Sequence, residues 1–177
     1  MQKSKYHHRG KFLSLLEREN WEYAERVNCQ GVVAIIATTA EEDIVLVEQF
    51  RIPVNASVIE LPAGLVGDSK KLQGEAHIEA ASRELYEETG FQASSWDDIC
   101  SAPISAGMSS EIISFVRATG LSRSGAGGGD STEDIRVHII PLNNVDQWLY
   151  EQSNNGKLID PKIYAALYWI KSAKYNS

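Results

Sequence analysis

An acidic helix closed by a glycine is the feature that most constrains how this chain can fold. Residues 75–89 contain no glycine or proline and are rich in Ala, Glu and Leu, and Gly90 follows where a helix is expected to end. At about 100° per residue, Glu84, Glu87 and Glu88 fall on one face. Beside them runs an apolar stripe of Ile78, Ala81 and Leu85. The sequence therefore predicts a helix with one buried edge and one acidic edge.

Three glutamates on one face repel one another, by roughly 0.2–0.5 kcal/mol per pair when exposed and by more when buried. Mg²⁺ or Mn²⁺ removes this repulsion, because carboxylates are hard oxygen donors that leave sites for water and phosphate oxygens. Arg83 can also pair with Glu87 or Glu75 and hold the acids in place. The alternative is a solvated acidic face, since runs of charge usually face water. We expect His77, on the acidic side, to face solvent.

Length and charge narrow the possible classes of function. A chain of 177 residues favours one domain with, at most, an added arm. A net charge of −7 opposes binding to nucleic acid. No apolar run approaches the roughly 20 residues that span a bilayer, and the first residues lack the apolar core of a signal peptide, so we expect no membrane partner and a cytoplasmic location. Cys29 and Cys100 are too few for a disulfide framework and are expected to be small buried hydrophobes.

Strand-like segments flank the acidic helix on both sides. The first 25 residues show little alternation before a strand-like segment at 21–27, and we expect them to form an arm. Two β-branched runs, 31–39 and 43–50, are separated by a short polar turn and predict a hairpin. The four glycines of residues 121–134 predict a flexible surface loop. Further strands are expected at 97–104, 111–121 and 134–142, and further helices at 143–153 and 161–174.

The spacing of residues in the acidic helix resembles the signature of the Nudix hydrolases. The matching residues are Glu75, Arg83, Glu84, Leu85, Glu87, Glu88, Gly90 and Phe91. The family pattern has a glycine six residues before the first glutamate, where this chain has Ser69; its corresponding glycine is Gly64, so the loop is about five residues longer. The resemblance implies an α+β fold, the Nudix α/β/α sandwich with a mixed sheet, over residues 31–177. Residues 1–30 would form an N-terminal β arm that crosses to the partner in a homodimer.

Four further segments resemble the branch of ADP-ribose pyrophosphatases and nucleoside-diphosphate-sugar hydrolases. They are VEQFR at 47–51, ELPAG at 60–64, TEDIRVH at 132–138 and GKLIDPKIYAALYWI at 156–170. ADP-ribose pyrophosphatases typically carry a proline in a Ser-Pro-Gly segment after the helix, but here Ala106 takes its place. The expected substrate is therefore a nucleotide sugar such as ADP-ribose, GDP-mannose or a similar compound.

The resemblance also implies roles for single residues. Two or three Mg²⁺ ions, or Mn²⁺, would be held by the carbonyl of Ala63 and the carboxylates of Glu84, Glu87 and Glu88. Glu133 would be the general base, delivered when its loop closes, and Arg83 and Glu87 would complete the catalytic group. Asp130, Glu111 and Asp134 are the alternatives for the base. A metal-activated water needs only modest help from such a base.

Substrate contacts are implied at both ends of the predicted sheet. Arg51 would contact the diphosphate, although a surface arginine beside a proline turn is an alternative, and Glu60 would add a polar contact. Trp21 would stack on the nucleotide base, with Glu22 and Arg26 close enough to bind base or phosphate. A core or interface aromatic is the alternative for Trp21.

The reaction that these residues imply is hydrolysis of a diphosphate bond. A nucleotide sugar and water would give a nucleoside monophosphate and a sugar phosphate. Two alternatives remain open. A non-catalytic sensor of ADP-ribose or a related nucleotide is disfavoured because all three glutamates are present. A housecleaning pyrophosphatase for damaged nucleoside triphosphates is disfavoured by the LPAG, EQFR and TEDIRVH segments.

Overall fold

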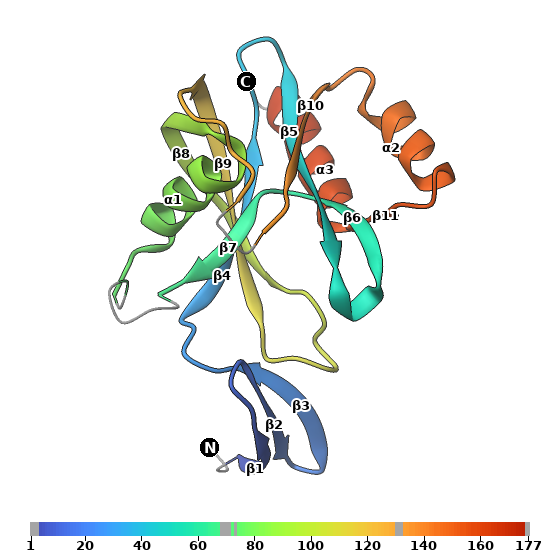
Figure 1. Ribbon diagram of the computed structural model, residues 1–177. Helices are drawn as coiled ribbons and strands as arrows, with labels where there is room; N and C mark the ends of the chain where they lie inside the picture. The colour runs from blue at the N-terminus through green and yellow to red at the C-terminus, as the bar shows by residue number, and fades with distance from the viewer. Residues whose placement is uncertain (1–3, 68–71, 73, 130–132, 176–177) are drawn as a thin grey trace.

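The described residues form three sheets and three α-helices (Figure 1). The structure is a computed structural model of residues 1–177, and it describes all of them except 1–3, 68–71, 73, 130–132 and 176–177. The arm sheet has the order β1-β2-β3, formed by Lys5–Arg9, Leu13–Arg18 and Trp21–Arg26. A second sheet has the order β7-β4-β9-β8, formed by Ala63–Val66, Gly31–Ala37, Ile112–Arg123 and Phe91–Pro103. The third has the order β10-β5-β6-β11, formed by Arg136–Pro141, Asp43–Arg51, Ala56–Glu60 and Leu158–Ile159.

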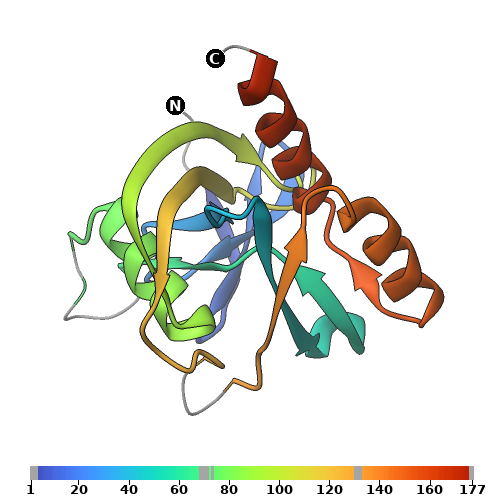
Figure 2. The ribbon, with the colours of Figure 1, turned by 90° about the horizontal axis from the view of Figure 1, so that it is seen from above.

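Three helices cover the two central sheets on opposite sides (Figure 2). The helix α1 spans His77–Thr89, α2 spans Val145–Asn154 and α3 spans Lys162–Tyr175, and a short 3-10 turn, η1, covers Ile52–Val54. In the view from above, α1 lies on one side of the sheets and α2 and α3 lie on the other. The α+β class and the α/β/α sandwich that the sequence predicts are confirmed.

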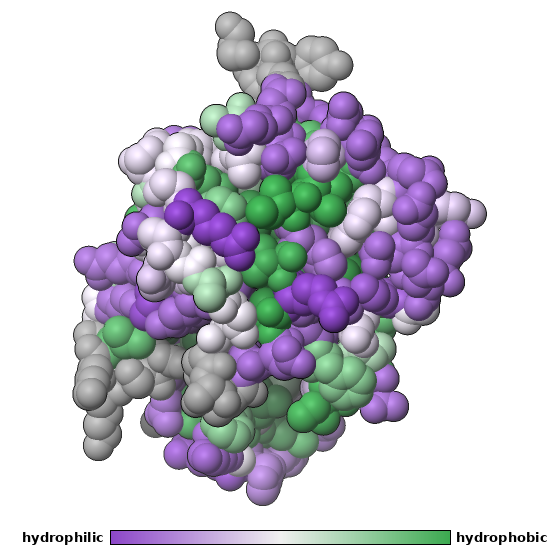
Figure 3. Space-filling model, turned by 45° about the horizontal axis from the view of Figure 1, so that its top comes forward, coloured by the Kyte–Doolittle hydropathy of each residue, from purple (hydrophilic) through white to green (hydrophobic). Residues whose placement is uncertain are grey.

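The strand β4 explains why the core has two halves. Its residues alternate between the two faces, so that Val33 and Ile35 pack with α1 while Ala34 and Ile36 pack with α2 and α3. A strand that is buried on both faces needs an uninterrupted apolar sequence, which is what residues 31–37 provide. In the space-filling view of Figure 3, hydrophobic residues still reach the surface as a central band between hydrophilic margins.

The predicted hairpin of residues 31–39 and 43–50 is wrong. Both segments are strands, but β4 pairs with β7 and β9 whereas β5 pairs with β6 and β10. The two strands share only an isolated bridge between Thr38 and Ile44 beside the turn. The centres of both runs are apolar because they are buried in the sandwich, and an apolar run does not identify its neighbours.

The acidic helix begins two residues later than expected and ends where predicted. Gly90 takes a left-handed conformation, with φ 74°, and its amide donates to the carbonyl of Tyr86 at 2.8 Å. The predicted stripe turns inward, because Ala81 and Leu85 are buried and Ile78 is partly buried against the same cluster. The helix therefore presents its acidic edge beside β7, which contains Ala63 and Gly64.

The arm sheet lies apart from the sandwich at the base of the view in Figure 1. It is tied to the loop before β9 by backbone hydrogen bonds, from the amide of Ala24 to the carbonyl of Met108 at 2.8 Å and from the amide of Ser110 to the carbonyl of Ala24 at 3.1 Å. Only its third strand was expected, because β1 is exposed throughout and shows no burial pattern.

Candidate active site

One buried and one partly buried glutamate form the centre of the candidate site. Glu88 is only 3% exposed, and one of its carboxylate oxygens accepts a hydrogen bond from the amide of Ala63 at 3.1 Å. Glu84 lies directly against Gly64, where an added Cβ would be 1.9 Å from the carboxyl carbon of Glu84. Burial raises the pKa of Glu84 to about 7 and that of Glu88 to about 8. The LPAG turn and the helix thus bring two carboxylates together in a place that disfavours their charge.

Arg83 contacts three acidic side chains on or just before the helix. Its guanidinium donates to Glu84 at 2.7 Å, to Glu87 at 3.3 Å, to Glu75 at 3.1 Å and to the carbonyl of Leu65 at 3.2 Å. The pairs with Glu75 and Glu87 are those that the spacing suggested. The hydrogen bond from Arg83 holds the pKa of Glu75 below its usual range. Arg83 therefore fixes the acidic edge of α1 against β7.

The carboxylates fit a hard divalent cation in their chemistry. Glu84 and Glu88 are shielded oxygen donors whose pKa values are raised chiefly by burial, and a bound cation would stabilise their charged forms. Among the described residues, no three acidic, histidine or cysteine side chains meet at one metal position. The contacts of Arg83 account for this, because they draw Glu84 and Glu87 toward the guanidinium.

Glu133 lies close to this pair of carboxylates. Its negative charge adds to the burial that raises the pKa of Glu84 and Glu88. Asp134 lines the same cavity as Glu133, whereas Glu111 forms an ion pair with Arg26 near the arm, at 3.2 Å. Asp130, the remaining alternative for the base, lies outside the described residues, as do Ser69 and most of the longer loop.

The glycine-rich segment is docked rather than free. Residues 124–129 donate backbone hydrogen bonds to the end of α1, including one from Gly128 to the carbonyl of Glu88 at 2.8 Å. The segment also lies beside α1 in both ribbon views (Figures 1 and 2). The expectation of a flexible surface loop is therefore wrong for the described part of the loop, because its glycines bind the last turn of the helix.

Arg51 and Glu60 are also brought to the glutamates. Arg51 donates to the carboxylate of Glu60 at 2.7 Å, and its positive charge acts on Glu88, where burial is the larger influence on the pKa. A cavity of about 390 Å³ opens beside them and reaches Glu133. Its lining consists of Glu48, Gln49, Phe50, Ile52, Ser57, Glu133, Asp134 and Arg136.

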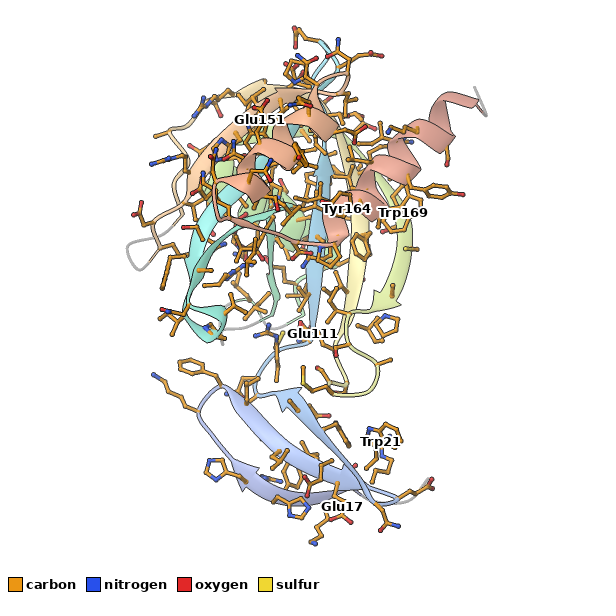
Figure 4. The ribbon with its side chains drawn as sticks, turned by 90° about the vertical axis from the view of Figure 1, so that its right-hand side faces the viewer. Glu17, Trp21, Glu111, Glu151, Tyr164 and Trp169 are labelled. Carbon is orange, nitrogen blue, oxygen red and sulfur yellow. The ribbon has the colours of Figure 1, made fainter. Side chains whose placement is uncertain are left out.

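The structure does not bring the predicted base-binding residues to the glutamates within one chain. Trp21 is 62% exposed on the arm, and its indole nitrogen donates to the carbonyl of Gly107 at 2.9 Å (Figure 4). Trp21 and Glu22 line a shallow surface hollow that shares no residue with the cavity at Glu133. Arg26 pairs with Glu111. The segment with Ala106 in place of the usual proline thus lies beside Trp21.

Several polar residues near the site were missed. Glu48 accepts hydrogen bonds from Lys157 at 2.7 Å and from His138 at 2.9 Å, and it lines the cavity. Burial acts to raise the pKa of Glu48, but these two donors outweigh it and lower the pKa. The signal was available, because Glu48, His138 and Lys157 all lie in the segments that resemble the branch. Arg136, in the same segment as His138, was missed in the same way.

Three minor predictions have mixed outcomes. His77 is half-exposed, as expected, but it also pairs with Asp98 at 2.6 Å. Cys29 and Cys100 are partly buried rather than fully buried, and both are free thiols. No helix among the described residues is both long and apolar enough to cross a membrane.

The chain is similar to several known proteins. A family model described as the NUDIX domain matches residues 29–154. The methanol dehydrogenase activator of Bacillus methanolicus is 35% identical over 148 residues, which cover 83% of this chain and 75% of that protein. An ADP-ribose pyrophosphatase of Bacillus subtilis (strain 168) is 39% identical over 98 residues, 55% of this chain and 50% of that enzyme. An ADP-ribose pyrophosphatase of Escherichia coli (strain K12) is 30% identical over 138 residues, 73% of this chain and 62% of that enzyme.

A solved structure has the same fold. The crystal structure of an ADP compounds hydrolase superposes with a TM-score of 0.69 at 20% identity, and the match covers 99% of this chain and 96% of that one. The sandwich with its glutamate-bearing helix defines a Nudix-type protein, and the chain belongs to the Nudix family. The predicted resemblance is confirmed, because the chain carries the Nudix domain over most of its length. The chain matches only 50% of the length of the Bacillus subtilis pyrophosphatase and 62% of the length of the Escherichia coli enzyme.

Proposed function

We propose that this chain hydrolyses the diphosphate bond of ADP-ribose or a related nucleotide sugar to a nucleoside monophosphate and a sugar phosphate. The observation that carries the proposal is the pair of shielded carboxylates, Glu84 and Glu88, with Arg51 and Glu133 beside them. The names of the Bacillus subtilis and Escherichia coli relatives support ADP-ribose as the first substrate to test.

Divalent cations, which Nudix hydrolases generally use, would neutralise the phosphate oxygens and activate the attacking water. We expect Mg²⁺, with Mn²⁺ as a substitute, held by Glu84, Glu87, Glu88 and the carbonyl of Ala63. Arg83 holds Glu84 and Glu87 on the acidic edge of α1. For Glu87 to bind the cation, its exposed carboxylate would turn from Arg83, a contact of 3.3 Å that costs little to break.

Two residues of the chain would act on the substrate and on the attacking water. Arg51, oriented by its 2.7 Å contact with Glu60, would place positive charge at the diphosphate. Glu133 would accept the proton of the attacking water, and Asp134 and Glu111 remain the described alternatives. Arg83 would act on the carboxylates rather than on the substrate.

The nucleotide base of the substrate would bind to a second copy of the chain. Trp21, Glu22 and Arg26 lie on the arm and do not meet Glu133 within one chain, yet a nucleotide sugar needs both sets of residues. A homodimer in which arm 1–30 crosses to the Nudix domain 31–177 of the partner would bring them together. An exposed Trp21 is suited to stack on a purine, which contributes about 1–3 kcal/mol. We expect this dimer to be cytoplasmic.

A substrate panel tests the proposal. The purified protein is incubated with Mg²⁺ and ADP-ribose, GDP-mannose, ADP-glucose, UDP-glucose, diadenosine polyphosphates or 8-oxo-dGTP, and the products are separated by chromatography. We expect AMP and ribose 5-phosphate from ADP-ribose, and the matching pair of products from other nucleotide sugars. Release of pyrophosphate from 8-oxo-dGTP alone would indicate a housecleaning enzyme, and binding without cleavage would indicate a sensor.

A further inference from the structure

The glycine-rich segment between β9 and β10 makes an unusual contact with the helix α1. An α-helix leaves the carbonyls of its last four residues without partners inside the helix. Here the amide of Gly128 donates to the carbonyl of Glu88 at 2.8 Å, and the amide of Gly129 donates to the carbonyl of Glu87 at 3.0 Å. Two of the three glutamates whose side chains form the acidic edge therefore also bind the loop through their backbones.

Only glycine fits at position 127, where the loop lies against the last turn of the helix. Gly127 has a φ of 71°, and a Cβ there would lie 2.5 Å from the carbonyl carbon of Thr89 and 2.7 Å from the carbonyl oxygen of Glu88. Both neighbours are backbone atoms of the last helical turn and cannot turn aside. Gly125 lies flat against the ring of Tyr86, where a Cβ would be 3.0 Å from a ring carbon. The run of glycines therefore allows the loop backbone to lie directly on the helix.

The contact fixes both sides of Glu133. Before it, Gly129 is bonded to Glu87, and after it the amide of Ile135 donates to the carbonyl of Gly128 at 3.2 Å. The side chain of Ile135 is buried, which anchors this end as well. The described residues on either side of Glu133 are thus linked to the end of α1, Gly129 directly through the carbonyl of Glu87 and Ile135 through Gly128, whose amide binds Glu88.

We propose that Gly125–Gly129 form a backbone latch that positions Glu133 relative to the carboxylates of Glu84 and Glu88. The inference rests on the proposed function, in which Glu133 accepts a proton at the cation site. The latch glycines are positioning residues, because they touch neither substrate nor cation and act through Glu133. Misplacing a reacting group by about 1 Å can cost roughly 100-fold in rate.

The test compares Gly127→Ala with Gly156→Ala. Gly156 has a φ of 82°, close to that of Gly127, but nothing lies within 4 Å of an added Cβ. The two variants therefore share the backbone strain and differ in the clash with α1. We expect Gly127→Ala to lower kcat by about tenfold or more, with KM changed by less than about threefold, and Gly156→Ala to retain the wild-type kcat.

A double-mutant cycle separates positioning from a general loss of structure. In a Glu133→Gln background there is no base left to position, so Gly127→Ala should lower kcat by less than about threefold. Equal losses in the two backgrounds would overturn the positioning role while leaving the proposed function intact. A wild-type protein that cleaves no member of the substrate panel would overturn the proposed function and the positioning role together.

Amide hydrogen exchange by NMR tests the latch without any turnover. The amides of Gly128 and Gly129 should be protected in the wild type and in Gly156→Ala, and should exchange at least about tenfold faster in Gly127→Ala. Fast exchange of both amides in the wild type would overturn the latch. A folded Gly127→Ala variant with wild-type protection and wild-type kcat would also overturn it.

Discussion

The end of α1 and the N-terminal arm provide two different kinds of binding surface. At α1, Arg83 and Glu84 are largely shielded, and Arg83 finds partners no more than 18 residues away in sequence. On the arm, Trp21 is 62% exposed and its partner Gly107 is 86 residues away. The difference indicates a division of labour, because a shielded group of charges suits chemistry and an exposed aromatic ring suits recognition. We expect changes at α1 to act on kcat and changes on the arm to act on KM.

The largest effect should come from Glu88. Glu88→Gln removes a carboxylate from the proposed cation site, so kcat should fall by about 100-fold or more. The melting temperature in the absence of metal should stay the same or rise, because burial raises the pKa of Glu88 to about 8 and its charge is unfavourable there. Glu151→Gln, an exposed position on α2, is the control for both measurements. Wild-type kcat in folded Glu88→Gln would remove Glu88 from the site.

A smaller loss of kcat is expected from Gly64→Ala. The added methyl group would meet the carboxyl of Glu84 at 1.9 Å and displace it from β7, which should lower kcat by about 10- to 100-fold. Gly31→Ala is a matched control on the adjacent strand, because nothing lies within 4 Å of its added Cβ. Steady-state kinetics should therefore separate these two otherwise identical substitutions. Equal activities would show that the position of Glu84 does not matter.

Trp21→Ala should change KM instead. Loss of one stacking contact is expected to raise KM for a purine nucleotide sugar by about tenfold, with kcat less affected. Trp21→Phe retains a flat ring, and its KM should lie between those of the wild type and Trp21→Ala. If KM is unchanged in Trp21→Ala, Trp21 serves only to join the arm to the loop at Gly107.

The smallest effect is expected on the free energy of unfolding, from Glu48 in the wall of the cavity. The pKa of Glu48 in the folded protein is below its ordinary value of 4.5. The ionised carboxylate therefore stabilises the folded protein above pH 4.5. This stabilisation is lost as the pH falls through the lowered pKa. Glu48→Gln should therefore lower the unfolding free energy by about 1–3 kcal/mol at pH 7 and by less at pH 3. Urea unfolding at both values measures the difference. An equal loss at pH 3 would mean that packing, not charge, accounts for it.

Sequence reasoning was most successful where neighbours in space are neighbours in sequence. The end of α1 at Gly90 and the pairing of Arg83 with Glu75 and Glu87 follow from helical spacing alone. The separation of β4 from β5 could not be predicted, because partners of a doubly buried strand are chosen by packing across the whole sandwich.

The docking of the glycine-rich segment was missed for a different reason. Glycine is compatible with both a free loop and a close backbone contact, and only the three-dimensional structure distinguishes them. The hydrogen bond between Trp21, at the start of β3, and Gly107, in the loop before β9, joins two segments far apart in the chain, and nothing in either segment indicates the other.

Manganese binding tests the central claim, a divalent cation site at Glu84 and Glu88, most directly. Titration of Mn²⁺ into the protein, followed by the electron paramagnetic resonance signal of the free ion, measures binding without substrate. The wild type and Glu151→Gln should bind Mn²⁺ in competition with Mg²⁺, and Glu88→Gln should bind it at least about tenfold more weakly. Equal binding by the wild type and Glu88→Gln, or no binding by either, would contradict the account.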